Sequence, residues 1–132
     1  MAIVPVRLGV KRVSEALERA FRRRGTRKLV AIQGHLGVNA RELGQIFGGV
    51  TRQAVEQWMQ RGVPVERYAD VDRVAELAEQ LAATFERERL PSIVRAKLPA
   101  LDGRTILESI ERDGPVRAFA LLERLHSWSP GA

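Results

Sequence analysis

Residues 39–64 read NARELGQIFGGVTRQAVEQWMQRGVP, and this stretch is the most informative about the fold. Its first part predicts a short helix, because Asn39 and Glu42 have the spacing of a capping box. A pair of glycines ends that helix, and Thr51 is a suitable N-cap for a second helix. A Gly-Val-Pro run then ends the second helix. A helix, a tight turn and a second helix are the layout of a helix-turn-helix unit.

The second helix of this unit carries polar side chains that suit the major groove of DNA. The candidate DNA-binding residues are Thr51, Arg52, Gln53, Gln57 and Arg61. Arginine can pair with guanine through two hydrogen bonds and glutamine with adenine, while a threonine at a helix N-terminus can hold a phosphate. Val55 and Trp58 lie on the opposite face, so we expect both in the core. A plain solvent-exposed helix would present a similar polar face, and Trp58 has the alternative role of stacking on a base.

The turn of this unit is longer than usual. The run from Gly44 to Trp58 has one residue more than the common pattern, and the extra residue falls in Gly48-Gly49-Val50. We therefore expect a looser turn and a changed angle of the second helix.

The rest of the chain also predicts short helices. Apolar residues recur at helical spacing over 10–24, 28–36, 69–86 and 115–127, and a second capping box, Thr105 with Glu108, starts a helix that ends at Gly114. Gly25 is expected to end the first of these helices, and a strand is the alternative over 28–36. In the last helix the residues expected to point inward are Ala118, Leu121, Leu122 and Leu125. The prediction is an all-α fold of six to seven short helices, with an N-terminal helix-turn-helix lobe packed against a small C-terminal helical lobe.

Charge and proline placement divide the chain into three parts. Residues 1–37 form a basic helical extension, 38–88 the helix-turn-helix lobe and 89–132 the C-terminal lobe. The first thirty residues hold nine lysines and arginines against two glutamates. Such an excess favours binding to a polyanion, although a solvated basic face is the alternative. Three roles are open for the extension: an arm that contacts DNA, a segment for dimerisation, or an N-terminal segment that proteases degrade.

Residues with catalytic or ligand-binding potential are sparse. The chain has no cysteine, and His35 and His126 have no second histidine or carboxylate at ligand spacing. The Gly34-His-Leu-Gly37 run lacks the Lys-Ser/Thr pair of a phosphate loop. No apolar run has the length of a membrane span, and the start lacks the pattern of a secretory signal. We expect a cytoplasmic protein that is not an enzyme and has no cofactor, metal or membrane partner.

The order of motifs resembles the Xre–MbcA–ParS family of antitoxins. Runs in two regions carry the resemblance. The first region holds Leu43-Gly-Gln-Ile-Phe, then Thr51-Arg-Gln-Ala-Val-Glu-Gln-Trp58, then Arg61-Gly-Val-Pro64. The second, in the C-terminal lobe, holds Leu98-Pro-Ala-Leu-Asp-Gly-Arg-Thr105 followed by Ile106-Leu-Glu-Ser-Ile110. The resemblance covers about residues 38–128.

The resemblance implies an antitoxin of a type II toxin-antitoxin system. Its N-terminal lobe would bind operator DNA and repress its own operon, and its C-terminal lobe would neutralise a RES-domain toxin that consumes NAD. Such antitoxins usually dimerise, so a homodimer or a hetero-oligomer with the toxin is implied. The toxin-binding residues carried over from the family are Leu101, Gly103, Arg104 and Thr105 in a structural turn, and Arg117, Arg124 and Trp128 on the last helix.

Two other functions fit the same residues. A phage-type Cro-like transcriptional regulator without a toxin partner is compatible with the segment from Trp58 to Arg67, and 91–128 would then serve dimerisation. A protein-interaction module that has lost DNA binding is the third interpretation.

Overall fold

The computed structural model describes residues 3–127, with side chains from residue 9 onward. Its helices are α1 (Ile3–Leu36), α2 (Ala40–Ile46), α3 (Arg52–Arg61), α4 (Tyr68–Thr84), α5 (Leu90–Ile93), α6 (Ile106–Asp113) and α7 (Val116–Ser127), with 3-10 turns at Val65–Arg67 and Pro99–Leu101. No strand occurs within this range, so the predicted all-α fold is confirmed. None of the helices over 3–127 combines the length and the apolar character needed to cross a membrane.

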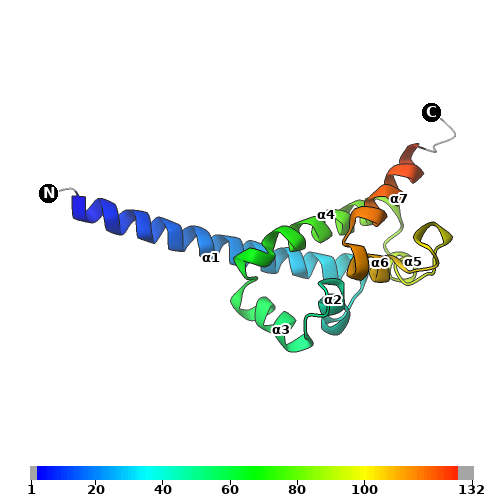
Figure 1. The fold of residues 1–132 in the computed structure, drawn as a ribbon, viewed down its shortest axis with the longest axis horizontal. Helices are drawn as coiled ribbons and strands as arrows, with labels where there is room; N and C mark the ends of the chain where they lie inside the picture. The colour runs from blue at the N-terminus through cyan, green and yellow to red at the C-terminus, as the bar shows by residue number, and fades with distance from the viewer. Residues whose placement is uncertain (1–2, 128–132) are drawn as a thin grey trace.

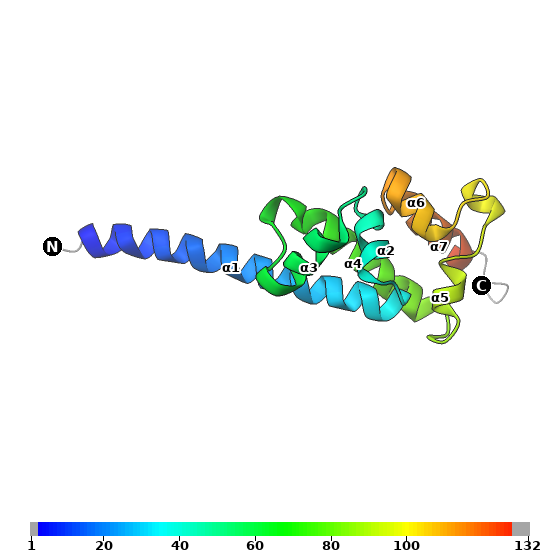
Figure 2. The ribbon, with the colours of Figure 1, turned by 90° about the horizontal axis from the view of Figure 1, so that it is seen from below.

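The helices α1 and α4 lie side by side and form the spine of the molecule (Figure 1). Lys28 on α1 and Asp72 on α4 form an ion pair of 2.8 Å across this contact. The α2–α3 pair packs against one side of the spine, and α5, α6 and α7 gather at its far end (Figure 2). The N-terminal half of α1 extends well beyond all other helices in both views.

One hydrophobic core joins these helices. It includes Leu29, Ile32 and Leu36 from the second half of α1, together with buried residues of every later α-helix. The second half of α1 is therefore part of the core that positions α2 and α3. The division of the chain at residues 37 and 88 stays a prediction.

The predicted helix end at Gly25 is wrong, because α1 runs without a break from Ile3 to Leu36. Gly25 is buried, and a Cβ placed on it would lie 2.7 Å from the Cβ of Val63. The Val63 N–H also donates to the Arg22 carbonyl of α1, at 3.2 Å. The glycine thus lets the segment after α3 approach the side of α1, and it does not act as a helix stop.

Alanine at position 25 is expected to destabilise the protein despite its better helix propensity. Exchanging glycine for alanine in an open helix position gains up to about 1 kcal/mol, whereas overpacking against a core residue costs about 1–3 kcal/mol. We expect Gly25→Ala to lower the free energy of urea unfolding. Gly34→Ala is the matched control on the same helix, since nothing lies within 4 Å of a Cβ there, and it should be neutral or stabilising. An equal increase in the free energy of unfolding for Gly25→Ala and Gly34→Ala would contradict the close contact with Val63.

Candidate nucleic-acid interface

The turn between α2 and α3 folds back onto α2. The Gly44 carbonyl accepts hydrogen bonds from the Val50 N–H, at 2.9 Å, and from the Phe47 N–H, at 3.2 Å. Gly48 and Gly49 follow each other with φ values of 85° and 84°, which glycine adopts at little cost. The two glycines absorb the longer turn, and α2 and α3 remain packed against each other.

The start of α2 is fixed by the predicted capping box. The Asn39 side chain accepts the Glu42 N–H at 2.8 Å, and the Asn39 N–H donates to the Glu42 carboxylate at 3.1 Å. This prediction is confirmed. The helix that supports the turn therefore begins at a defined residue.

Buried side chains hold α3 against the body. Val55 is fully buried and Trp58 is 8% exposed, with its ring edge-on to Phe47 at 6.2 Å between centroids. The Arg67 guanidinium lies over the indole at 5.8 Å, and the Thr26 hydroxyl of α1 donates to the Trp58 carbonyl at 2.7 Å. The predicted core position of Trp58 is confirmed, and an indole this buried is not available to stack on a base.

The predicted DNA-binding residues lie together on the outer side of α3. The Thr51 hydroxyl accepts the Ala54 N–H at 3.1 Å and caps the helix, as predicted. Gln53, Gln57 and Arg61 are exposed and follow one another along the helix at intervals of four residues. Arg52 is also exposed, but it pairs with the Glu56 carboxylate at 3.1 Å, one turn further along.

Sequence analysis missed two arginines of α1 that lie next to this face. Where α1 passes the C-terminal end of α3, Arg23 and Arg27 line a shallow depression together with Arg61. Three guanidinium groups from two helices thus border one surface. The basic excess of the first thirty residues was the available signal, but it did not indicate which of those residues face α3.

A tight turn precedes α6. Leu101 is buried, and Asp102 and Gly103 have φ values of 58° and 79°. The Leu98 N–H donates to the Arg104 carbonyl at 3.1 Å and closes the turn.

The same turn leads into α6 through the second predicted capping box. The Thr105 hydroxyl accepts the Glu108 N–H at 3.0 Å, and the Thr105 N–H donates back to the Glu108 carboxylate at 3.1 Å, which lowers the pKa of that carboxyl. Asp102 forms an ion pair of 2.9 Å with Arg117 of α7, so one predicted toxin-binding arginine is tied to this turn. Arg124 is exposed on α7, and Trp128 lies outside the described residues.

An apolar groove of about 310 Å³ opens beside this turn. Its lining includes Leu81, Phe85, Ile93, Leu98, Leu121 and Leu125, from α4, α7 and the segment between α4 and α6. The prediction that Leu125 points into the core is wrong. It is 47% exposed and lines the open groove together with Leu81 and Phe85. Ala118 and Leu122 are buried as predicted.

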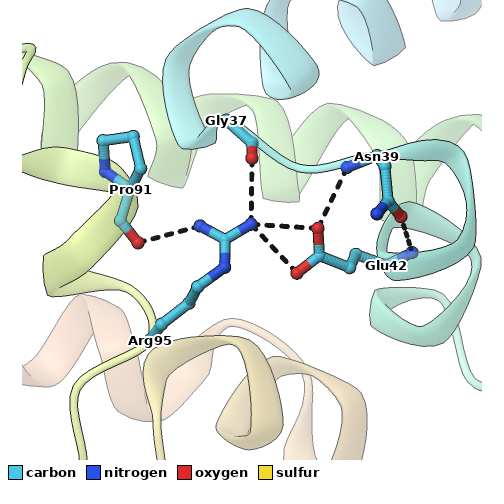
Figure 3. A network of polar contacts seen from close by, with 5 residues as sticks. All are labelled: Gly37, Asn39, Glu42, Pro91 and Arg95. Carbon is cyan, nitrogen blue, oxygen red and sulfur yellow. Dashed lines mark hydrogen bonds and ion pairs between the residues drawn. The ribbon is translucent and has the colours of Figure 1, made fainter.

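Arg95 connects the C-terminal lobe to the start of α2 (Figure 3). Its guanidinium donates to both carboxylate oxygens of Glu42 at 2.9 Å, to the Gly37 carbonyl at 2.9 Å and to the Pro91 carbonyl at 2.8 Å. Partial burial raises the pKa of Glu42, but the hydrogen bonds from the Asn39 N–H and Arg95, with the Arg95 charge, outweigh it and hold the pKa below 4.5. One carboxylate thus caps α2 and fixes α2 relative to α5.

This network is expected to make the fold sensitive to acid. A carboxyl whose pKa is lowered in the folded state contributes stability above its unfolded pKa, and that contribution is lost as the pH falls through the folded value. Glu42→Gln should cost about 1 kcal/mol at neutral pH, since the groups are partly solvated. Urea unfolding of wild type and Glu42→Gln, measured at decreasing pH, should show the difference between their unfolding free energies shrinking as the carboxyl becomes protonated. Glu88→Gln, at an exposed position, is the control; a constant Glu42→Gln difference at every pH would contradict this role.

Comparison with known proteins gives no family for this chain. No protein-family model, curated protein or solved structure matches it. Within the part of the chain that the structure describes, no three His, Asp or Glu residues are placed to hold a metal ion. The assignment of function therefore depends on the geometry of α3 and of the C-terminal lobe.

Proposed function

We propose that the chain is a DNA-binding transcriptional regulator whose α3 enters the major groove. The observation that carries this proposal is the outer face of α3, where Gln53, Gln57 and Arg61 are exposed in one row. The opposite face, with Val55 and Trp58, fixes the helix to the body. A recognition helix needs both properties, because side chains that reach base edges must be held at a constant orientation.

The charges around α3 support this role. Arg23, Arg27 and Arg61 border the end of the helix, where they suit the phosphate backbone on either side of a groove. Thr51 and Arg52 lie at the other end, near the helix N-terminus, which also favours an anion. The row of glutamines thus lies between two positions suited to phosphates.

The ion pair of Arg52 with Glu56 does not prevent a contact with DNA. An exposed pair of residues four apart on a helix contributes about 0.3–0.5 kcal/mol, whereas a two-fold hydrogen bond to a base contributes about 1–3 kcal/mol of discrimination. Exchanging the pair for guanine or a phosphate is therefore favourable.

Selection of bound duplexes from a random pool, followed by affinity measurements at fixed salt, tests this proposal. We expect one enriched sequence, and we expect Gln53→Ala to weaken its binding by about 5–150-fold, which corresponds to about 1–3 kcal/mol, with relaxed preference at one base pair. Gln80→Ala, at an exposed position on α4, is the matched control and should leave the affinity unchanged. Arg27→Ala should weaken all duplexes alike and reduce the salt slope by about 1. No enriched sequence would contradict the proposal.

We also propose that the C-terminal lobe neutralises a RES-domain toxin, which makes the chain the antitoxin of a type II toxin-antitoxin pair. The resemblance supplies the partner class, and the apolar groove beside the turn at Leu101 supplies a surface for it. A groove with an almost wholly apolar lining suits an apolar helix or side chain of another protein.

Co-purification with the product of the adjacent gene, followed by an NAD-consumption assay, tests the antitoxin proposal. A tight complex that suppresses NAD loss is expected. Leu125→Glu should weaken it, whereas Val116→Glu should not, because Val116 is also exposed on α7, at 57% against 47% for Leu125, but lies outside the groove. No complex and no effect on NAD would favour the phage-type regulator without a toxin.

A further inference from the structure

The N-terminal half of α1 carries an apolar stripe that is largely exposed among the residues that the structure describes. Val10, Val13, Leu17 and Phe21 are between 41% and 66% exposed. The N-terminal half of α1 extends beyond the other helices (Figures 1 and 2). Four large apolar side chains in one row on a free-standing helix are unusual for a surface that faces only water.

The spacing of this stripe is that of a coiled coil. With Ala20 included, apolar residues occur at positions 10, 13, 17 and 20, and the alternation of three and four continues back along the sequence to Ile3 and Val6. This 3.5-residue period keeps the apolar row facing a partner helix through a left-handed supercoil. Val10 and Leu17 then occupy the a positions, and Val13 occupies a d position.

The charges on this segment allow two identical helices to meet. Every charged residue between 9 and 22 lies off the seam, at the outer b, c and f positions: Lys11, Arg12, Glu15, Glu18, Arg19 and Arg22. Between residues 3 and 21 the e and g positions, which face each other across a two-stranded coiled coil, hold Arg7, Gly9, Ser14, Ala16 and Phe21, so Arg7 is the one charged residue among them. In a parallel pair the e position of Arg7 lies opposite the g position at residue 2, which is an alanine in the sequence, so two copies of this chain meet without like charges opposed across the seam.

The stripe ends where the chain begins to cover its own helix. The Phe21 ring lies edge-on to Tyr68 of α4, with 5.3 Å between centroids, and Gly25 and Leu29 are buried in the body. Before residue 21 the helix has no such support, and an isolated helix of this length is only marginally stable in water.

We propose that residues 3–21 of α1 pair with the same segment of a second copy in a two-stranded coiled coil. This interface is independent of the DNA-binding and toxin-binding proposals. A basic amphipathic helix can also lie on an anionic membrane. Glu15 and Glu18 on the outer face disfavour that surface, and the 3.5-residue period favours a partner helix.

Sedimentation equilibrium of the full chain over a range of concentrations tests the proposal. We expect the mass of wild type to rise to twice the 14.8 kDa of one chain. Val13→Glu should shift the protein to the monomer, because it places a charge at the centre of the seam. Val30→Glu is the matched control, since Val30 lies on the same helix at 55% exposure against 59% for Val13 but outside the stripe, and it should stay dimeric. A wild-type monomer at all concentrations, or dimers equally stable in both variants, would overturn the proposal.

Oxidative cross-linking gives a second readout that does not depend on disrupting the helix. The chain has no cysteine, so a single one reports only its own position. Val13→Cys is expected to form a covalent dimer, because facing d positions bring the two Cα atoms within disulfide range, and Arg12→Cys on the outer face is not. Absence of the Val13→Cys dimer, or co-sedimentation of monomeric wild type with anionic phosphatidylserine vesicles, would show that the stripe serves another surface.

Discussion

Replacing Gly44 by alanine is expected to destabilise the protein by about 3 kcal/mol or more, because the new methyl group has no space. A Cβ on Gly44 would collide with the Val50 carbonyl oxygen and lie 3.4 Å from the Val55 side chain. The obstacle is backbone, so it moves only if the turn between α2 and α3 changes. The N–H of the same residue, Val50, donates to the Gly44 carbonyl at 2.9 Å and closes the turn. Urea unfolding followed by circular dichroism measures the loss, and affinity for the selected duplex should fall with it.

Gln45→Ala is the control for this variant. Gln45 is the next residue of α2 and is exposed, so its replacement should change stability by no more than about 0.5 kcal/mol. A Gly44→Ala protein as stable as wild type would show that the turn is looser than the hydrogen bonds at Gly44 indicate.

Trp58→Ala is expected to destabilise the protein by about 3–5 kcal/mol. The indole is 8% exposed and contacts Phe47, and its loss would leave a cavity where α3 rests on the body. A small domain has a total stability of about 5–15 kcal/mol, so this loss removes a large part of it. Trp58→Phe keeps an aromatic ring at this position, so it should lower the free energy of unfolding by less than half as much as Trp58→Ala. Thermal and urea unfolding of both variants measure the difference.

These two variants also separate the possible roles of Trp58. If the indole contributed by stacking on a base, Trp58→Ala would weaken DNA binding and leave the unfolding free energy nearly unchanged. We expect the reverse order, with instability as the primary effect.

The sequence predicted the helix-turn-helix unit well because its signals are local. A capping box needs only the side chains of two residues three apart, and both predicted boxes, at Asn39 and at Thr105, are present. Thr51 caps α3 in the same way. Short-range hydrogen bonds of this kind depend little on the rest of the fold, so they can be recognised before it is known.

Gly25 shows where local signals fail. A glycine after a helical run commonly ends the helix, but here it makes room for Val63, a residue 38 positions further along the chain. The distinction depends on a contact between distant segments, and no neighbouring residue encodes it.

Apolar periodicity has a similar limit at the candidate sites. It predicted which face of α7 and of α1 is apolar, but it did not show whether another helix covers that face. Leu125 and Val13 both have the spacing of core residues, and both are exposed. Arg23 and Arg27 were missed for the same reason, since only the path of α1 past α3 brings them to Arg61.

A map of backbone amide chemical shifts, recorded with and without the selected duplex, shows directly whether α3 contacts DNA. We expect the largest changes from Thr51 to Gln57 and at Arg61, with further changes at Arg23 and Arg27 and little change along α6 and α7. Changes concentrated around the groove between α4 and α7, or no saturable change anywhere, would contradict the account of α3 as a recognition helix.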